Sequence, residues 1–456
     1  MKTAYTKVRL DRTFYKSFFS VYVVLVLQNV VTLSVNLADN VMLGSYSETA
    51  LSGVAAVNQI QFVYQQLLIA LGDGLVIFCS QYWGRKMTGP MKKIAATAMQ
   101  AALLVCVILF AVVSIFPEQV LLLFTTDEQI IEQGVRYLNV IRFTYLFFAV
   151  TQILLAALRS VEVVKIAFIL SIQALVINCG INYILIYGKF GAPELGVTGA
   201  AIGTLAARIA ECAVLICYIA FKEKKLRIRL RDYFTFDRLL CKDYIKITAP
   251  MMVVQGLWGL NTAMQTVILG HMEAAAIAAN SVASTLFMLV KSIPIGAAST
   301  ASIMIGKKIG ENDLNMVKNY ARVLQKMFLC IGVICGVLLF FLRIPVLSLY
   351  QLSEGTRSMA NTFLIILSAI CIGMSYQMPT NNGIIRGGGN AMFVVKVDLI
   401  SIWLIVIPLS FVMAFVVKAS PAVVVCCLNA DQIFKCIPAF LEANYGHWIR
   451  KLTRDE

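Results

Sequence analysis

The sequence is short of the residues and motifs on which most enzymes depend. It holds only two histidines in 456 residues, His271 and His447, and both lie outside the long apolar runs. A phosphate-binding loop of the Gly-Lys-Ser/Thr type is also missing from the chain, so ATP is not expected as its direct energy source. We therefore expect no catalytic set, no cofactor and no enzymatic activity.

Charged residues are scarce as well. They make up 14% of the chain, whereas 59% is hydrophobic, and the mean hydropathy is +0.81. A soluble globular chain is about one quarter charged, so this composition indicates that lipid surrounds most of the surface. Lipid requires every backbone polar group to be bonded within its own segment, which favours helices. At about 20 residues per span, the length allows roughly twelve helices.

The net charge of +15 is a feature that nucleic-acid-binding proteins share. Here the basic residues lie in loops between apolar runs, a distribution that orients a membrane protein, so we exclude nucleic acid as a partner. The twelve cysteines lie mostly inside the apolar runs and show no metal-binding spacing. We expect them to be small buried apolar side chains.

Twelve apolar runs are long enough to cross a bilayer, and the sequence predicts an all-α, multi-pass membrane protein. They lie near 17–38, 52–78, 94–116, 135–157, 166–187, 197–221, 247–270, 279–305, 324–342, 360–384, 393–416 and 421–441.

Lysine and arginine alternate between rich and poor loops along the chain, which predicts the orientation. The rich segments include the N-terminal arm with Lys2, Lys7 and Arg9, and the long loop 222–246. The intervening loops have few basic residues, so the positive-inside rule places both termini in the cytoplasm. The arm runs into a long span with no small-residue cleavage site, so we expect no cleavable signal peptide and expect that span to be retained.

The two halves of the chain show a weak internal repeat. Val41-Met42-Leu43-Gly44 matches Val267-Ile268-Leu269-Gly270, and the same offset of 226 residues carries Gly84 onto Gly310. Six spans per half is an even number, so the halves have the same orientation, as in transporters built from parallel repeats. The sequence therefore predicts two pseudo-symmetric six-helix bundles, a lobe at 1–221 and a lobe at 247–456, joined by the basic loop 222–246.

Several motifs in order along the chain resemble the multidrug and toxic compound extrusion (MATE) family of efflux transporters, in its prokaryotic branch. The residues that carry the resemblance are Ala38-Asp39-Asn40-Val41-Met42-Leu43-Gly44, Ser80-Gln81-Tyr82-Trp83-Gly84, Leu158-Arg159-Ser160, Asn178 to Asn182, Leu195-Gly196-Val197-Thr198-Gly199-Ala200-Ala201 with Thr204, and Arg386-Gly387-Gly388-Gly389-Asn390. The resemblance implies a V-shaped pair of six-helix bundles. It also implies a monomeric antiporter that exports small amphipathic, often cationic, drugs or metabolites in exchange for protons or sodium ions.

Other functions are also compatible with a twelve-helix plan. A lipid-linked precursor flippase of the same superfamily should line its path with several cations, but Lys291 and Arg208 are the only obvious intramembrane bases. A transporter for one specific metabolite is a further alternative. A major-facilitator transporter is disfavoured, because Gly84-Arg85-Lys86 is too short to be the loop motif of that family. A membrane receptor is disfavoured by the internal repeat and by the lack of a soluble signalling domain.

Asp39 is the main candidate for cation coupling. It lies near the end of the first span, close to Asn36, and a charged carboxylate at membrane depth is costly unless it binds a cation, pairs with a base or keeps its proton. Asn178 and Asn182 are four residues apart and share one helix face. With Thr204, whose place follows from the resemblance, they suggest a site for H⁺ or possible Na⁺. The alternative is that Asp39 is wetted at the membrane edge and the amides only join helices.

This pattern departs from the resemblance at two positions. Many prokaryotic members carry a second acidic residue at the position of Asn182. Many also carry an acidic residue early in the seventh helix, where this chain has Gly256 and Trp258 and no acid. The coupling ion is therefore open between H⁺ and Na⁺.

The second lobe offers Asp398 and Lys291 as candidate groups for a cation or a substrate. Arg208 with Glu211, and Asp431 with Lys435, have the spacing of internal ion pairs. Candidates for a substrate cavity are Asp73, Tyr64, Tyr137, Trp258, Tyr376 and Trp403. The aromatic members suit stacking on flat cations, but lipid-facing packing is an equally simple role for them.

Overall fold

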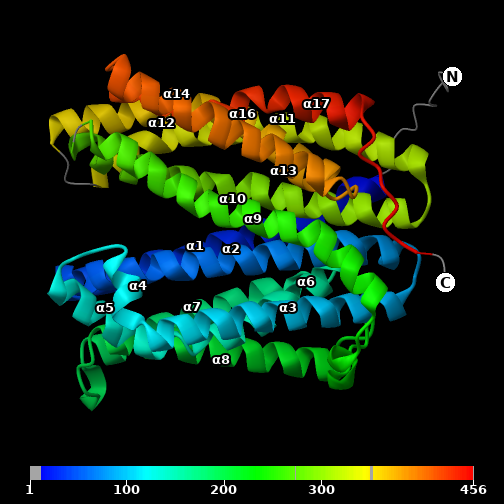
Figure 1. Cartoon of the computed structure of the whole chain (residues 1–456), viewed down its shortest axis with the longest axis horizontal. Coiled ribbons are helices and arrows are strands. Elements are labelled where there is room, and N and C mark those ends of the chain that lie inside the picture. The colour runs from blue at the N-terminus through cyan, green and yellow to red at the C-terminus, as the bar shows by residue number, and fades with distance from the viewer. Residues whose placement is uncertain (1–11, 273, 350–352, 455–456) are drawn as a thin grey trace. The chain divides into compact units, whose positions relative to one another are not determined.

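A computed structural model describes residues 12–272, 274–349 and 353–454 of the chain. Within these ranges the fold is helical, and the one departure toward β-structure is an isolated bridge between Gly389 and Ile449. Figure 1 follows the helices from α1 to α17 along the chain. Lys2, Lys7 and Arg9, on which part of the predicted orientation depends, lie outside the described residues.

Contacts divide the chain into two compact units. The N-terminal unit comprises Leu27–Cys79 and Met87–Gln255, and the C-terminal unit comprises Ser80–Lys86, Gly256–Glu456 and the chain up to Val26. The boundaries fall inside α1, α2 and α9, so these three helices contribute residues to both units. The lobes predicted at 1–221 and 247–456 stay a prediction.

The N-terminal unit is a bundle of long helices, of which α7 and α8 form the most extensive pair. Its elements are most of α1 (Arg12–Tyr46) and α2 (Glu48–Gly84), then α3 (Thr88–Ile115), α4 (Pro117–Leu122), α5 (Glu128–Ile141), α6 (Thr144–Ser160), α7 (Lys165–Ile186), η1 (Lys189–Gly191), α8 (Val197–Phe221), η2 (Leu230–Phe234) and the first half of α9 (Arg238–Gly270).

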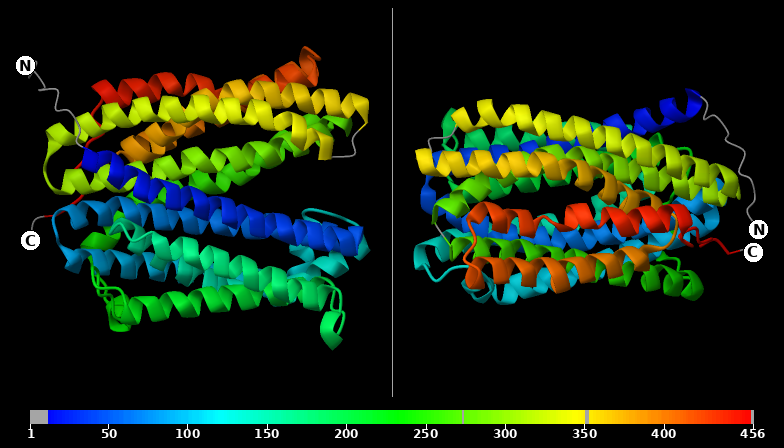
Figure 2. Two further views of the ribbon diagram at one scale, coloured as in Figure 1. Left: turned by 180° about the vertical axis from the view of Figure 1, so that it is seen from behind. Right: turned by 90° about the horizontal axis from the view of Figure 1, so that it is seen from above.

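The described residues of the C-terminal unit include three stretches of wide π-helix, η3, η4 and η5. Figure 2 shows the helices from two further sides, with the last part of the chain in yellow to red. The elements of this unit after α9 are α10 (Ala274–Gly310), α11 (Leu314–Leu349), α12 (Glu354–Pro379), η3 (Thr380–Ile385), α13 (Ala391–Leu399), η4 (Ile400–Val406), α14 (Ile407–Phe411), η5 (Val412–Val416), α15 (Pro421–Leu428), α16 (Asp431–Phe434) and α17 (Cys436–Tyr445).

Every predicted span coincides with a helix or a run of helices. Within the part of the chain that the structure describes, ten helical stretches are long and apolar enough to cross a membrane, and α5 with α6 makes an eleventh that bends by 54° at the break between them. The predicted span 247–270 falls in α9, which is not among them. This helix begins with a polar segment that includes Arg238, Lys242 and Asp243, and Pro250 interrupts its backbone bonding.

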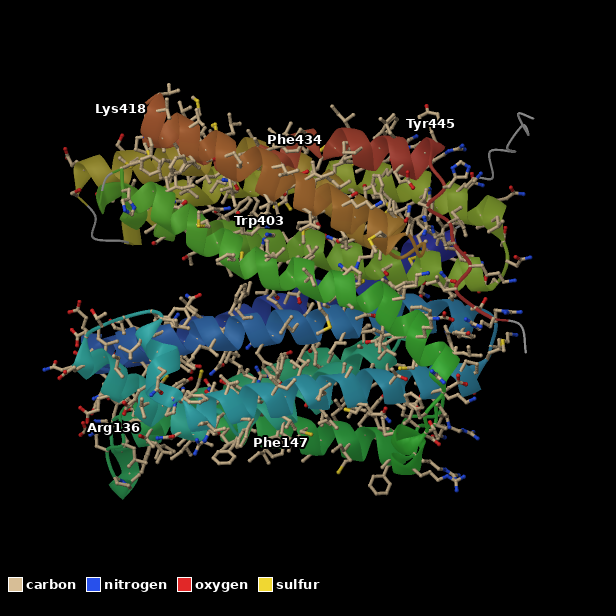
Figure 3. The ribbon with its side chains drawn as sticks, in the orientation of Figure 1. Arg136, Phe147, Trp403, Lys418, Phe434 and Tyr445 are labelled. Atoms are coloured by element: carbon tan, nitrogen blue, oxygen red, sulfur yellow. The ribbon has the colours of Figure 1, made fainter. Side chains whose placement is uncertain are left out.

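Small residues allow the helices to pack closely, as expected where lipid supplies no hydrophobic force between them. Gly332 and Gly336 are four residues apart on α11, and a Cβ added to them would lie 3.0 Å from the Ile372 carbonyl oxygen and 2.7 Å from the Ser368 carbonyl oxygen of α12. On the other side of the same unit, Figure 3 shows Trp403 part-way along the α13–η5 stretch and Lys418 at its end. The lysine thus marks where this apolar stretch stops.

Candidate functional site

Four of the residues predicted for cation coupling come together inside the N-terminal unit. The Asn182 side chain on α7 donates a hydrogen bond of 2.6 Å to the Asp39 carboxylate on α1. The same amide nitrogen is 3.3 Å from the Asn178 Oδ1 one turn earlier, and Asn178 donates to the Thr204 hydroxyl on α8 at 3.1 Å. Three helices therefore supply one chain of hydrogen bonds that ends on a carboxylate.

Glycines on α8 make this approach possible. A Cβ added to Gly203 would sit 2.0 Å from the Asn182 Oδ1, and one added to Gly199 would sit 2.7 Å from the Leu185 carbonyl oxygen. Asn178 and Asn182 are 1% and 0% exposed, so their amides are sealed between α7 and α8. The missing side chains on α8 hence provide the room that the amides occupy.

The chain of hydrogen bonds leaves oxygen atoms available. Asn182 Oδ1 is buried and accepts no hydrogen bond within the described residues. Together with the second oxygen of Asp39, Asn178 Oδ1 and the Thr204 hydroxyl, it forms a set of oxygen ligands of the kind that bind Na⁺-like hard cations. A single carboxylate among neutral oxygens can equally take up a proton, since either cation removes the charge that apolar surroundings disfavour.

Tyr137, predicted for the substrate cavity, belongs instead to the surroundings of Asp39. Its ring is 4% exposed, and its hydroxyl interacts with the side chains of Thr204 and Gln61. Arg208 is the positive charge that acts on Asp39, and it is held by Glu211 at 2.7 Å, as the spacing predicted. Asn36 was predicted as part of the site, but its side chain is exposed and makes no hydrogen bond to Asp39.

The other predicted cavity aromatics differ in their surroundings. Tyr64 is 2% exposed and its hydroxyl donates to the Tyr145 carbonyl at 2.8 Å, while Tyr376 is 7% exposed and donates to Gln325 at 2.8 Å. Trp258 and Trp403 are only partly buried. The two tyrosines thus have internal partners, whereas the two tryptophans keep accessible surface for a ligand or for lipid.

Asp73 lies where three helices approach each other. A Cβ on Gly74 would lie 2.4 Å from the Thr248 hydroxyl on α9, and one on Gly72 would lie 3.2 Å from Ala156 on α6. The Asp73 charge acts on Arg159, also on α6. These contacts favour helix packing as the role of the flanking glycines, and a cavity role for Asp73 stays a prediction.

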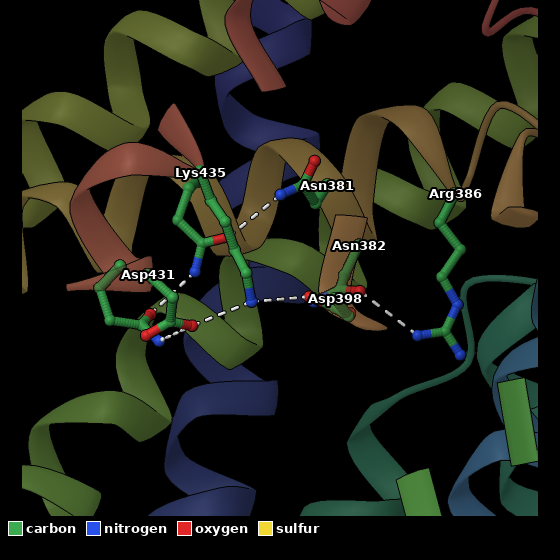
Figure 4. Close-up of polar contacts among 8 residues, drawn as sticks. Asn381, Asn382, Arg386, Asp398, Asp431 and Lys435 are labelled. Atoms are coloured by element: carbon green, nitrogen blue, oxygen red, sulfur yellow. Dashed lines mark hydrogen bonds and ion pairs between the residues drawn. The ribbon is translucent and has the colours of Figure 1, made fainter. Parts of the chain in front are cut away.

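A second polar cluster lies in the C-terminal unit, shown in Figure 4. The Lys435 ammonium is 2.8 Å from Asp398 on α13 and 2.9 Å from Asp431 on α16, and its side chain is only 4% exposed. Gln432 donates to Asp431 at 2.8 Å and accepts from Gln377 of α12 at 2.8 Å. The predicted pair of Asp431 and Lys435 is confirmed, but no local pattern predicted that Asp398 would also contact Lys435.

The N-terminal unit also holds a cavity that no sequence motif predicted as a site. Its volume is about 480 Å³, and it lies at the end of α1, beside the middle of α5 and at the start of α8. The polar residues that line it are Tyr46, Ser47, Gln133, Arg136, Glu194 and Thr198. Tyr46 is the last residue of α1 and lies about two turns after Asp39 on the same helix. The cavity therefore adjoins the end of the helix that carries Asp39.

Comparison with known proteins assigns this sequence to one family. The sequence profile of the MatE family matches residues 25–184 and 250–412. The chain belongs to the MatE family. The two matched ranges begin 225 residues apart, close to the offset of 226 that the internal repeat predicted. MatE members are membrane transporters, and this chain is a multi-pass membrane protein of that kind.

Relatives of known name cover most of this MatE chain. It is 26% identical over 379 residues to the probable multidrug resistance protein YoeA of Bacillus subtilis, covering 81% of this chain and 80% of that one. It is 24% identical over 430 residues to the probable multidrug resistance protein NorM of Thermotoga maritima, covering 94% and 92%.

Solved structures show the same fold. A crystal structure of MATE in the straight conformation superposes with a TM-score of 0.85 at 16% identity, covering 94% of this chain and 95% of that one. The eukaryotic MATE transporter AtDTX14 gives 0.82 at 18% identity, covering 95% and 96%. The predicted fold, twelve helices in two repeats, is confirmed.

Proposed function

We propose that this MatE protein is a secondary antiporter that exports amphipathic, often cationic, compounds in exchange for H⁺ or Na⁺. The observation that carries the proposal is the Asp39 carboxylate, bonded to Asn182 and set beside neutral amide and hydroxyl oxygens on apolar helices. We further propose that it acts as a single chain in the plasma membrane, with both termini in the cytoplasm and no cofactor.

The mechanism follows from the electrostatics of Asp39. A carboxylate at membrane depth is costly when charged, on the order of 2.5–3.5 kcal/mol on insertion scales. A proton or sodium ion removes this cost, and any conformation that buries the neutralised group more deeply then gains population. Asp39 is on α1, so cation binding acts directly on the position of this helix relative to α7 and α8.

Only one carboxylate takes part in this set, because position 182 is an asparagine. We therefore propose that one positive charge is taken up at this site in each cycle. Neutral oxygens from Asn178, Asn182 and Thr204 would complete the shell of a sodium ion, and the same groups would hold Asp39 in place if the ion is a proton.

The flippase alternative is less well supported by the charges present. A pyrophosphate-linked lipid needs several available cations, but Arg208 is paired with Glu211 at 2.7 Å and Lys435 is enclosed by Asp398 and Asp431. Lys291 has no such ion pair within the described residues, and its ammonium lies over the ring of Trp258. One such lysine suits a single negative charge better than a pyrophosphate.

The proposal is tested by efflux of ethidium from proteoliposomes under an imposed H⁺ or Na⁺ gradient. Wild-type protein should respond to one of the two gradients, and Asp39→Asn should abolish the response. Glu118→Gln, which removes an exposed acid from the start of α4, is the matched control and should leave the response unchanged. Equal gradient-driven transport by wild type and Asp39→Asn would remove Asp39 from the mechanism.

A further inference from the structure

Lys291 is a charged residue in the membrane-spanning part of α10 that the proposed coupling does not use. It lies within the candidate span Ala279–Gly310, between Val290 and Ser292, which are 3% and 1% exposed. Its ammonium stands 4.8 Å from the centre of the Trp258 ring on α9. An intramembrane lysine is costly and needs a partner that compensates its charge.

The carboxylates of the same unit do not provide that partner directly. Asp431 acts on Lys291 electrostatically, but it already pairs with Lys435 at 2.9 Å and accepts from Gln432 at 2.8 Å. Among the residues that the structure describes, Lys291 has a ring contact with Trp258 but no hydrogen bond and no ion pair. The three N–H donors of its ammonium therefore have no hydrogen-bond acceptor within the described residues. The net charge of the region is nevertheless zero, because the two lysines are balanced by Asp398 and Asp431.

The groups around Lys291 suit an amphipathic ligand. Met288 lies one turn before Lys291 on α10 and is 37% exposed, and Trp258 and Lys291 are both only partly buried. An indole ring and a thioether form an adaptable apolar wall for a flat molecule. A single ammonium beside such a wall matches a singly charged carboxylate. A phosphate group would call for further cations, and Lys435 is enclosed by its own carboxylates.

We propose that Lys291, Trp258 and Met288 form a subsite for the carboxylate end of an amphipathic substrate, so that carboxylic acids and zwitterions are transported as well as cations. The inference rests on the proposed export function and extends its substrate class. The substrate carboxylate accepts the N–H groups of Lys291, and its apolar part lies against Trp258 and Met288. Cationic substrates without a carboxylate do not use Lys291.

The test is the binding of one rhodamine dye in two forms, the free carboxylic acid and its methyl ester, to the purified full-length protein. Fluorescence anisotropy at zero gradient measures both affinities. Wild type should bind the acid more tightly than the ester. Lys291→Met should weaken binding of the acid by about tenfold or more, the usual effect of losing a charge-assisted hydrogen bond, and leave binding of the ester unchanged. Lys291→Arg should keep most of the preference.

Lys396→Met is the matched control, since Lys396 is an exposed lysine on α13 of the same unit, and it should bind both forms like wild type. Equal loss of acid and ester in Lys291→Met would assign Lys291 a structural role and overturn the subsite. A wild-type preference for the ester would overturn it without any variant. Failure of the export function would show differently, as an absence of gradient-driven efflux of either dye.

Discussion

Gly84 at the end of α2 and Gly310 at the end of α10 face each other at backbone contact distance. A Cβ on Gly84 would lie 2.9 Å from the Gly310 Cα, and a Cβ on Gly310 would lie 3.0 Å from the Gly84 Cα and 1.9 Å from the Gln81 carbonyl oxygen. These are the two glycines that the repeat offset of 226 residues aligned. Equivalent positions of the two repeats therefore meet, and the absence of side chains at both is what lets the helices touch.

Gly310→Ala is expected to destabilise the protein by about 1–3 kcal/mol, because the new methyl group would overlap backbone that cannot move aside. The readout is the unfolding midpoint in detergent. Gly89→Ala near the start of α3 is the control, since no atom lies within 4 Å of the added Cβ. A Gly310→Ala protein as stable as wild type would show that the two helix ends are not in contact.

Gly203→Ala should impair cation coupling although it replaces none of the residues that supply the oxygen ligands. Its Cβ would fall 2.0 Å from the Asn182 Oδ1 and displace the amide that bonds Asp39. We expect gradient-driven ethidium efflux to fall several-fold. Gly180→Ala on α7 meets nothing within 4 Å and should transport like wild type. Normal transport by Gly203→Ala would mean that the position of Asn182 does not matter for coupling.

Lys435→Met should be among the most destabilising single changes in the C-terminal unit. It leaves Asp398 and Asp431 without their shared ammonium, and breaking a buried ion pair from one side costs about 3–5 kcal/mol. Adding Asp398→Asn to this variant should recover part of the loss, because one uncompensated charge is removed. Unfolding midpoints of the two single variants and the double variant measure the coupling, and strict additivity would contradict it.

The C-terminal segment 448–454 is expected to contribute to the stability of the C-terminal unit. Gln81 of α2 is fully buried, donates to the Arg450 carbonyl at 3.1 Å and accepts from the Leu452 amide at 2.8 Å. Gln81→Ala should cost about 1–3 kcal/mol, since it leaves partner groups unsatisfied. In a chain truncated after His447 the same substitution should cost much less. An equal cost in both chains would show that these contacts are not the cause.

The loop before α9 should detach in acid. The pKa of Asp232 is lowered by the Arg229 backbone N–H and by Lys92, and the pKa of Asp237 is lowered by the Leu240 backbone N–H and by Lys93. A lowered pKa in the folded state gives stability above the usual aspartate pKa of about 4 and loses it as pH falls through the folded-state value.

Hydrogen-exchange protection of the segment 222–237, corrected for the intrinsic rate, should therefore decrease below about pH 4 while it stays constant near neutrality. The double variant Asp232→Asn, Asp237→Asn should show low protection both in acid and near neutral pH. Acid-insensitive protection of the wild-type loop would show that the two carboxylates do not hold it against α3.

Local physical rules were enough to predict where along the chain the helices lie. Apolar runs of about 20 residues must form helices in lipid because backbone groups have no other partners, so the predicted spans all fall on helices, from α1 to α17. The same locality explains why the pairs Arg208 with Glu211 and Asp431 with Lys435 could be predicted: residues three or four apart on a helix are neighbours whatever the fold.

Only the tertiary structure decided which distant side chains meet. Asp39 and Asn182 are 143 residues apart, Asp398 and Lys435 are 37 apart, and these contacts depend on how helices rotate and pack, which no local pattern encodes. Packing turned Asn36 away from Asp39 and brought Tyr137 beside it. It also paired Asp431 with Lys435, so that Lys291 contacts the ring of Trp258 and has no ion pair of its own within the described residues. The sequence by itself determined the helices and the charges they carry, and the packing of those helices determined which charges are paired.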